Sequence, residues 1–266
     1  MKNWITTKIK LDVNKNELSR FHFKSFTLDS KGNTLDETEY DSESKVVCKR
    51  IYRYHDTGEV KEYLEYDPFD ELLERHCYIK NAAGDFDRHE FEFSDGQKSI
   101  KEFSYSAIGC ADKATIQDEN GMITGYEVFI FNDQGQVIEE IELDAENNET
   151  SKYEKTYQDD GLLLHEKQFQ DGQLFAAEAF GYDLQGNVIK KTYRNYKDNF
   201  EVIDEYKYDE NNNMVYNSTH QNGVLVFENT SAYDDEQNLD SEVFFELDFW
   251  ERRVVRYEKL MHEIME

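Results

Sequence analysis

The feature that most constrains this chain is a short repeat that runs through nearly its whole length. Each copy is an apolar stretch that ends in an aromatic residue, followed by a polar residue that opens a turn. The clearest copies are Tyr40-Asp41, Tyr66-Asp67, Tyr182-Asp183, Tyr208-Asp209 and Tyr233-Asp234. Eighteen such anchor positions lie between residues 29 and 248, and neighbouring anchors are 12, 13 or 14 residues apart. This spacing leaves room for one strand and one turn but not for a crossover helix.

The residues within each unit follow the two-residue period of a strand. Apolar residues precede most anchors at positions −1 and −3, as in Phe180 and Tyr182, and residues two apart share one face of a strand. Eleven of the thirteen glycines lie two to four residues after an anchor. Asp at the start and Gly near the end are typical of a type I turn followed by a left-handed residue.

These units predict an all-β fold. We expect a long antiparallel up-and-down meander of about 18 short strands, with its aromatic rows facing inward. Open sheets rarely exceed about ten strands without curling, because strand twist accumulates. The sheet should therefore coil into a single curved or spiral layer.

The two ends of the chain depart from the repeat. Residues 4–13 alternate in polarity and predict an edge strand. Residues 252–265 place Val254, Tyr257, Leu260, Met261 and Ile264 at helical spacing, which predicts a short C-terminal amphipathic helix that caps the exposed sheet edge. No linker divides the chain, so we expect one β-repeat domain over residues 1–266, with repeats from about 20 to 250.

The repeat unit resembles the YD repeat of RHS-type bacterial proteins. The best copies are Phe180-Gly-Tyr-Asp-Leu-Gln-Gly-Asn-Val188 and Leu28-Asp-Ser-Lys-Gly-Asn33. In that family the repeats form β-hairpins stacked into a spiralling sheet, and in large members the sheet makes a shell around a toxin domain. This chain differs in its shorter spacing and in the many units that lack the Tyr-Asp or the Gly. The resemblance implies a β-spiral and a connection to bacterial toxin systems.

Composition narrows the environment and the partners. The chain has 58 acidic and 30 basic residues, for a formal charge of −28, so we expect no binding to nucleic acid or to anionic membranes. The first ten residues lack the apolar core of a signal peptide, and no apolar run reaches the length of a membrane helix. Cys48, Cys77 and Cys110 are too far apart for a zinc site or a disulfide framework. Together these features predict a cytoplasmic protein with reduced thiols.

The sequence contains no recognisable catalytic or cofactor motif, so we expect neither an enzyme nor a bound cofactor. His76, Cys77 and His89 form the most suggestive metal cluster, but adjacent strand residues point to opposite faces, and we expect no metal site there. Asp209-Glu-Asn211-Asn-Asn213 begins like a calcium loop, although His220 stands where the bidentate Glu should be.

The acidity is therefore the main indication of function. Our leading hypothesis is a bacterial immunity or antitoxin-type protein that neutralises a basic toxin, such as a nuclease, through an acidic surface. A structural or adhesion-type module that binds glycan or protein on an aromatic face is the first alternative, and a scaffold or chaperone for a secreted effector is the second. The predicted partner-binding residues are the acidic runs Glu139, Glu140, Glu142, Asp144, Asp159, Asp160, Asp234, Asp235 and Glu236.

Overall fold

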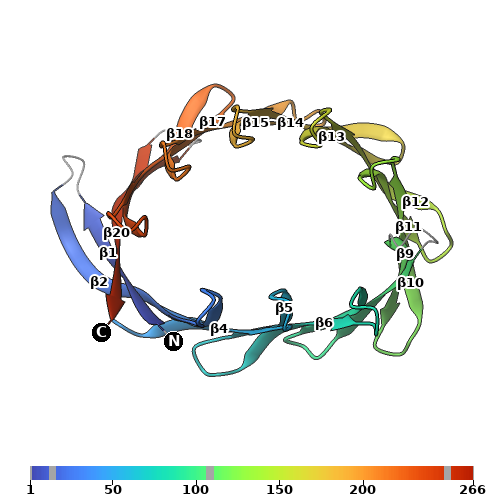
Figure 1. Cartoon of the computed structure of the whole chain (residues 1–266), viewed down its shortest axis with the longest axis horizontal. Coiled ribbons are helices and arrows are strands. Elements are labelled where there is room, and N and C mark those ends of the chain that lie inside the picture. The colour runs from blue at the N-terminus through green and yellow to red at the C-terminus, as the bar shows by residue number, and fades with distance from the viewer. Residues whose placement is uncertain (1, 12–15, 106–110, 249–252, 266) are drawn as a thin grey trace.

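The computed structural model is a single ring of antiparallel strands (Figure 1), and it describes residues 2–11, 16–105, 111–248 and 253–265. No helix occurs among these residues, and none could therefore span a membrane. The twenty strands are β1 (Lys2–Leu11), β2 (Glu17–Leu28), β3 (Thr34–Tyr40), β4 (Val46–Tyr54), β5 (Val60–Tyr66), β6 (Leu72–Lys80), β7 (Phe86–Phe93), β8 (Lys98–Tyr105), β9 (Ala111–Asp118), β10 (Ile123–Phe131), β11 (Val137–Asp144), β12 (Glu149–Tyr157), β13 (Leu163–Gln170), β14 (Gln173–Tyr182), β15 (Val188–Asn195), β16 (Phe200–Tyr208), β17 (Met214–Gln221), β18 (Val224–Tyr233), β19 (Leu239–Asp248) and β20 (Arg253–Met265).

The sheet closes on itself, which corrects the predicted open spiral. Each strand pairs with its neighbours in sequence, and β1 pairs with both β2 and β20. The ladder between β1 and β20 runs from Asn3 opposite Met265 to Leu11 opposite Tyr257. Closure gives every strand a partner on both sides, so the accumulated twist ends in a barrel with no free edge.

The predicted C-terminal helix is wrong, because residues 253–265 form strand β20. β20 hydrogen-bonds to β1 on one side and to β19 on the other, a position that a helix cannot occupy. The apolar residues at helical spacing, such as the adjacent Leu260 and Met261, instead fall on both faces of a strand. The predicted edge strand at residues 4–13 is likewise the interior strand β1, and residues 12 and 13 lie outside the described part of the chain.

The eighteen predicted strands correspond to β2 through β19, and β1 and β20 bring the total to twenty. The turns have the predicted chemistry. In the first described turn, the Asp29 carboxylate accepts hydrogen bonds from the backbone N–H groups of Lys31 at 2.7 Å and Asn33 at 2.9 Å, and Gly32 has φ +89°. Where glycine is missing at this fourth position, Ser44, Asp70, Asn147, Asn212 or Gln237 takes the left-handed conformation.

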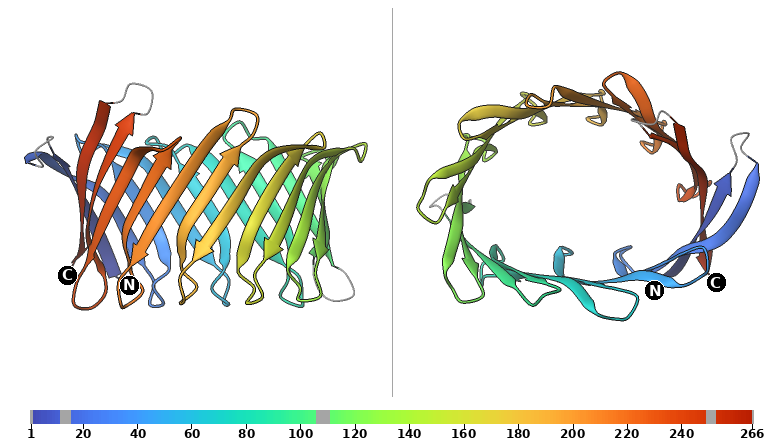
Figure 2. Two further views of the ribbon diagram at one scale, coloured as in Figure 1. Left: turned by 90° about the horizontal axis from the view of Figure 1, so that it is seen from above. Right: turned by 180° about the vertical axis from the view of Figure 1, so that it is seen from behind.

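Alternate turns lie at opposite ends of the barrel (Figure 2). We call the end that carries both chain termini the terminal rim; its described turns, spaced 25 or 26 residues apart except across residues 106–110, are 29–33, 55–59, 81–85, 132–136, 158–162, 183–187, 209–213 and 234–238. The opposite end, the distal rim, carries turns 41–45, 67–71, 94–97, 119–122, 145–148, 171–172, 196–199 and 222–223. Terminal-rim turns curl toward the axis, whereas distal-rim turns flare outward (Figure 1).

Tyrosine hydroxyls join neighbouring hairpins along the terminal rim. The Tyr182 hydroxyl donates to the carbonyl of Leu163 at 2.6 Å, which links the last residue of β14 to the first residue of β13. The same bond recurs from Tyr54, Tyr105, Tyr157, Tyr208 and Tyr233 to the first residue of the preceding strand. The tyrosine of the repeat therefore has a polar function at the rim in addition to its packing.

The strand register assigns each side chain to the lumen or to the outer face. Asn238, in the terminal-rim turn 234–238, lines the same cavity as Trp4 and His262. Because these turns curl inward, the face that they share with Trp4 and His262 is the lumen face (Figure 1). The strand register then shows which residues of every other strand share this lumen face. Most of the aromatic rows, including Tyr52 opposite Tyr63, lie on it.

The barrel has almost no conventional core. Among the described residues only Ile9, Cys48, Leu64, Ala114, Ala176 and Val226 are buried hydrophobic residues. A ring of twenty strands is too wide for its side chains to fill the centre, so the lumen face remains partly exposed. Stability must therefore come mainly from the backbone ladders and from side-chain pairs on each face.

Replacing Tyr182 with Phe should lower the free energy of unfolding by about 1 kcal/mol, because it removes one neutral hydrogen bond and leaves the ring in place. Urea denaturation followed by circular dichroism measures the change. Tyr196→Phe is the control, since that side chain is 47% exposed on the distal rim, and we expect a change within about 0.5 kcal/mol. Equal effects of the two substitutions would contradict the rim bond.

Deleting residues 253–266 should convert the protein to oligomers, because β1 and β19 would become free edges. Light scattering after size-exclusion chromatography measures the mass. A milder variant is Lys259→Pro, at a position paired with both Ile9 and Val243, which should lower the melting temperature. A monomeric deletion variant with an unchanged melting temperature would show that β20 does not close the barrel.

Candidate functional site

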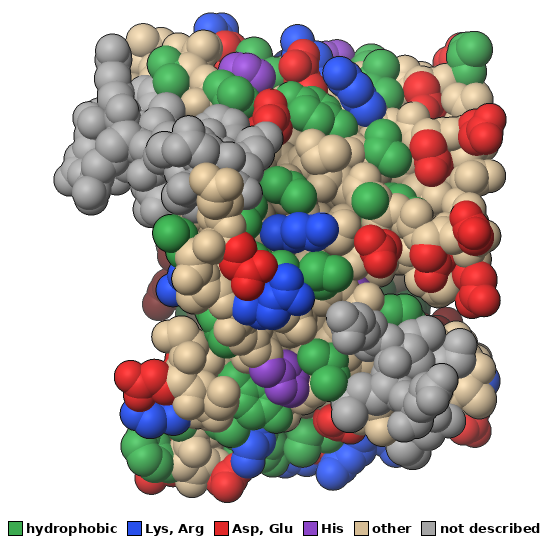
Figure 3. All heavy atoms as spheres, turned by 90° about the vertical axis from the view of Figure 1, so that its left-hand side faces the viewer, with side chains coloured by type: hydrophobic (Ala, Val, Ile, Leu, Met, Phe, Trp, Pro, Cys, Tyr) green, Lys and Arg blue, Asp and Glu red, His purple; other side chains and the backbone are tan. Residues whose placement is uncertain are grey.

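The acidity of the chain is concentrated at its two rims. The described terminal-rim turns carry thirteen acidic side chains and one basic side chain, Lys31, for a net charge of −12. The described distal-rim turns carry ten acidic and two basic side chains, for a net charge of −8. The rims thus hold most of the formal −28. Acidic side chains gather along the right-hand edge of the outer wall, where the terminal rim lies (Figure 3).

Turn geometry accounts for only part of this charge. Asp29, Asp183, Asp209 and Asp234 open their turns and accept backbone hydrogen bonds. Hydrogen bonds, above all from Asn187, hold the pKa of Asp183 below its usual range, and those from Asn213 do the same for Asp209. The other nine terminal-rim acids do not open turns: Asp56, Glu59, Asp85, Asp133, Asp159, Asp160, Glu210, Asp235 and Glu236.

Contacts between turns hold the terminal rim together. The Gln136 side chain donates to the carbonyl of Gly161 at 2.9 Å, and that of Asn213 donates to the side-chain oxygen of Gln237 at 2.7 Å. Each bond bridges one hairpin to the next. The acidic side chains are therefore displayed on a connected ring, which reduces the ordering required when a partner binds.

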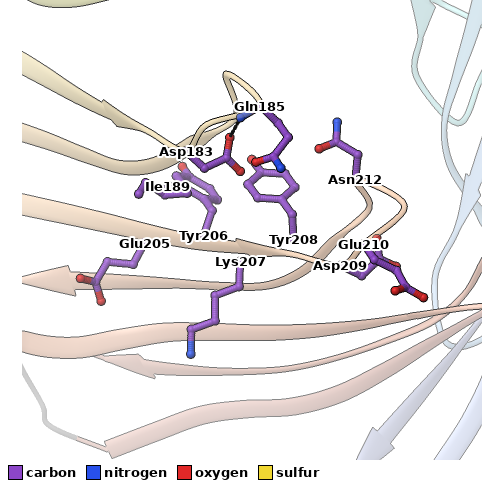
Figure 4. Close-up of a pocket in the computed structure, with 10 residues that line it drawn as sticks. All are labelled: Asp183, Gln185, Ile189, Glu205, Tyr206, Lys207, Tyr208, Asp209, Glu210 and Asn212. Atoms are coloured by element: carbon purple, nitrogen blue, oxygen red, sulfur yellow. Dashed lines mark hydrogen bonds between the residues drawn. The ribbon is translucent and has the colours of Figure 1, made fainter.

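An acidic groove lies between turns 183–187 and 209–213 (Figure 4). It has a volume of about 820 Å³ and is lined by four acids and one lysine, together with the rings of Tyr206 and Tyr208. The side chains of two of the acids, Glu205 and Glu210, make no hydrogen bond or ion pair with any other described residue. Strand alternation places Glu205 on the side of the strand opposite Tyr206 (Figure 4). Free carboxylates at the rim can pair with a lysine or arginine side chain.

The structure separates the predicted partner-binding residues into three places. Asp159, Asp160, Asp234, Asp235 and Glu236 lie on the terminal rim, in turns on different arcs of the ring. Asp144 lies at the distal rim, where its carboxylate accepts hydrogen bonds from the backbone of Glu146 and Asn148. The remaining three, Glu139, Glu140 and Glu142, lie within strand β11, so the runs do not form a single patch.

Strand alternation divides the run on β11. Glu140 and Glu142 face the lumen, whereas Glu139 faces outward beside Glu154. Lys155 pairs with Glu140 at 3.2 Å. Burial raises the pKa of Glu142, and the nearby charges of Glu127 and Glu140 add to the shift. Glu140 therefore takes part in a lumenal ion pair, and only Glu139 of this run faces outward.

The histidine cluster and the calcium-like turn carry no bound-ion geometry. His76 Nδ1 lies 3.1 Å from His89 Nε2 on the lumen face, while Cys77 points outward and donates to Glu62. Among the described residues, no three His, Cys, Asp or Glu side chains converge as metal ligands would. In turn 209–213 the Asp209 carboxylate is already engaged by the backbone of Asn211 and Asn213.

Glu205 and Glu210 are not among the predicted partner-binding residues, because they stand apart from the longer acidic runs in the sequence. The sequence does contain a signal that separates the two rims, because anchors two units apart lie at the same end of an up-and-down meander. Summing the charge of alternate turns would have separated the two rims and drawn attention to the turns with acids beyond the opening Asp.

Comparisons with known proteins give no family. No family model matches the chain, and no curated protein matches it in sequence. Among solved structures, it is similar to TcdB2-TccC3-TEV at 16% identity and a TM-score of 0.38, covering 87% of this chain and 13% of that one. It is also similar to TcdB2-TccC3-Cdc42 at 14% identity and a TM-score of 0.34, covering 92% and 15%. A porin-like protein from Bacteroides uniformis ATCC 8492 matches at 11% identity and a TM-score of 0.44, covering 98% and 97%.

Proposed function

We propose that this protein is a non-catalytic, cytoplasmic binding protein that captures a basic protein at its terminal rim. The type of activity that we favour is that of a bacterial immunity or antitoxin-type protein, which would neutralise a basic toxin by covering its cationic surface. The observation that carries the proposal is the excess of acids on the terminal rim over those that its turns require.

Charge favours a basic protein over other partners. A net −12 on one rim repels nucleic acid and anionic lipid and speeds the approach of a cationic surface. Once the partner is in contact, the free carboxylates of Glu205 and Glu210 can pair with its basic side chains.

The geometry also favours capture over chemistry. The groove's two turn-opening acids, Asp183 and Asp209, are occupied by backbone hydrogen bonds, and no described residue makes a hydrogen bond or ion pair with the carboxylates of Glu205 and Glu210. Such a surface can bind a cation but lacks the paired groups that general acid–base catalysis requires.

The cellular test is co-expression with the product of the adjacent gene. Rescue of growth, together with recovery of a stable complex, would support an immunity function. If that product is harmless and pull-downs recover no basic protein, the proposal fails.

Reversing charge at the terminal rim should slow binding of the recovered partner. The variant is Glu210→Lys, Asp235→Lys, Glu236→Lys, and at about 0.05 M salt we expect its association rate to fall roughly tenfold. The difference should shrink at about 0.5 M salt, where the Debye length is only about 4 Å. Stopped-flow fluorescence measures both rates.

The matched control reverses three distal-rim acids, Asp70→Lys, Glu71→Lys and Glu119→Lys, and so changes the net charge by the same amount. It should slow association much less if the partner docks at the terminal rim. An equal loss in both variants would show that only the total charge matters and would exclude a terminal-rim site.

A further inference from the structure

A second, chemically different cavity lies on the lumen face across strands β4 to β9. It has a volume of about 630 Å³, and its wall is mostly aromatic, with rings contributed by Tyr52, Tyr63, Tyr78, Phe86, His89 and Phe103. The rings are packed against one another. Tyr78 lies parallel to His89 with ring centroids 4.4 Å apart, and Tyr52 lies 5.3 Å from Tyr63. The wall is thus preorganised and needs little reordering to receive a ligand.

Two hydroxyls in this cavity have no partner among the described residues. Tyr63 donates to Glu65 and Tyr105 donates to the carbonyl of Phe86, so those two are satisfied. The hydroxyls of Tyr52 and Tyr78 make no such bond. Burial raises the pKa of both, so each stays a neutral O–H group that can donate to and accept from a ligand.

The charged groups of the cavity are already compensated. Lys101 pairs with Glu127 at 2.5 Å, Glu59 pairs with Lys80 at 2.8 Å, and Arg88, the third charged residue of the wall, pairs with Glu90. Each charged group of the wall therefore already has a partner of opposite sign. Both rims are strongly acidic, so an anionic ligand would be repelled before it entered the lumen.

We propose that this aromatic groove binds a neutral oligosaccharide. The C–H groups on the face of a pyranose ring carry partial positive charge and pack against the negative face of an aromatic ring. The sugar hydroxyls can both donate and accept hydrogen bonds, which matches the free hydroxyls of Tyr52 and Tyr78. A groove on the wall of an open-ended barrel also suits a chain longer than its contact region. This site is independent of the proposed capture of a basic protein.

Isothermal titration calorimetry on the intact chain tests the proposal with three hexasaccharides and one aromatic compound. Cellohexaose and chitohexaose are the neutral sugars, hexagalacturonate is the anionic sugar and N-acetyltryptophanamide is the aromatic compound. We expect cellohexaose to bind, and hexagalacturonate and N-acetyltryptophanamide to bind at least tenfold more weakly. Binding of chitohexaose tests whether the groove requires unsubstituted hydroxyls.

Tyr78→Phe should weaken cellohexaose binding about fivefold, the effect of one neutral hydrogen bond. Tyr52→Ala with Tyr78→Ala should abolish detectable binding, whereas Tyr193→Ala, which removes a lumenal tyrosine on the opposite arc, should leave it unchanged. Circular dichroism confirms that each variant is folded.

The proposal is overturned if neither neutral hexasaccharide binds, if hexagalacturonate or the aromatic probe binds as tightly as cellohexaose, or if the folded Tyr78→Phe variant binds with wild-type affinity. Loss of the basic partner in the rim variants would not affect these outcomes, so the two proposals can fail separately.

Discussion

The rest of this structure depends on the pairing of its first strand with its last. Antiparallel meanders leave two unpaired edges, and an edge of exposed N–H and C=O groups invites association with other chains. Here β20 fits between β1 and β19, and the ladder from Asn3 to Leu11 removes both edges at once. Closure fixes the circumference, and the circumference of twenty strands prevents the side chains from meeting at the centre. The lumen, its aromatic wall and the two separate rims all follow from that single ladder.

A wide barrel has to be stabilised without a packed interior. Its lumen face is held by cross-strand pairs, such as Lys155 between Glu140 and Glu166 at 3.2 and 3.5 Å. Pairs of this kind, half-buried and linked to their neighbours, contribute more than isolated surface pairs but less than apolar packing. At the terminal rim, the repeated tyrosine bond to the preceding strand adds a neutral contact that salt does not screen. Each hairpin is therefore stabilised by contacts of its own repeat residues, whereas a compact domain is stabilised by one shared core.

Much of the fold could be predicted from the sequence because its signals are local. The anchors recur every 12 to 14 residues and the Asp and Gly of each turn act within five residues, and together they predicted the eighteen strands that correspond to β2 to β19. Closure could not be predicted in this way, since the pairing of Asn3 with Met265 joins residues at opposite ends of the chain. The positions of Leu260 and Met261 fit a helix as well as they fit a strand. Residues 253–265 form a strand because β1 and β19 would otherwise each have an unpaired edge. Similarly, the run from Glu139 to Glu142 is contiguous in sequence, but strand alternation sends its members to opposite faces.

Charge at the rim and aromatic rings on the lumen wall act differently on a molecule that approaches the barrel: the charge selects it and the rings bind it. At physiological ionic strength the field of an exposed charge falls off within about 8 Å, which is little more than two residues along a strand. The acids of the terminal rim therefore act on whatever approaches the mouth and have little influence deep in the lumen. The aromatic groove begins at this rim, since Glu59 and the rim tyrosine Tyr105 line it, and its wall around Tyr78 carries compensated charges and free hydroxyls. A molecule that passes the rim is thus held by shape, stacking and hydrogen bonds, and the sign of its charge matters mainly at the entrance.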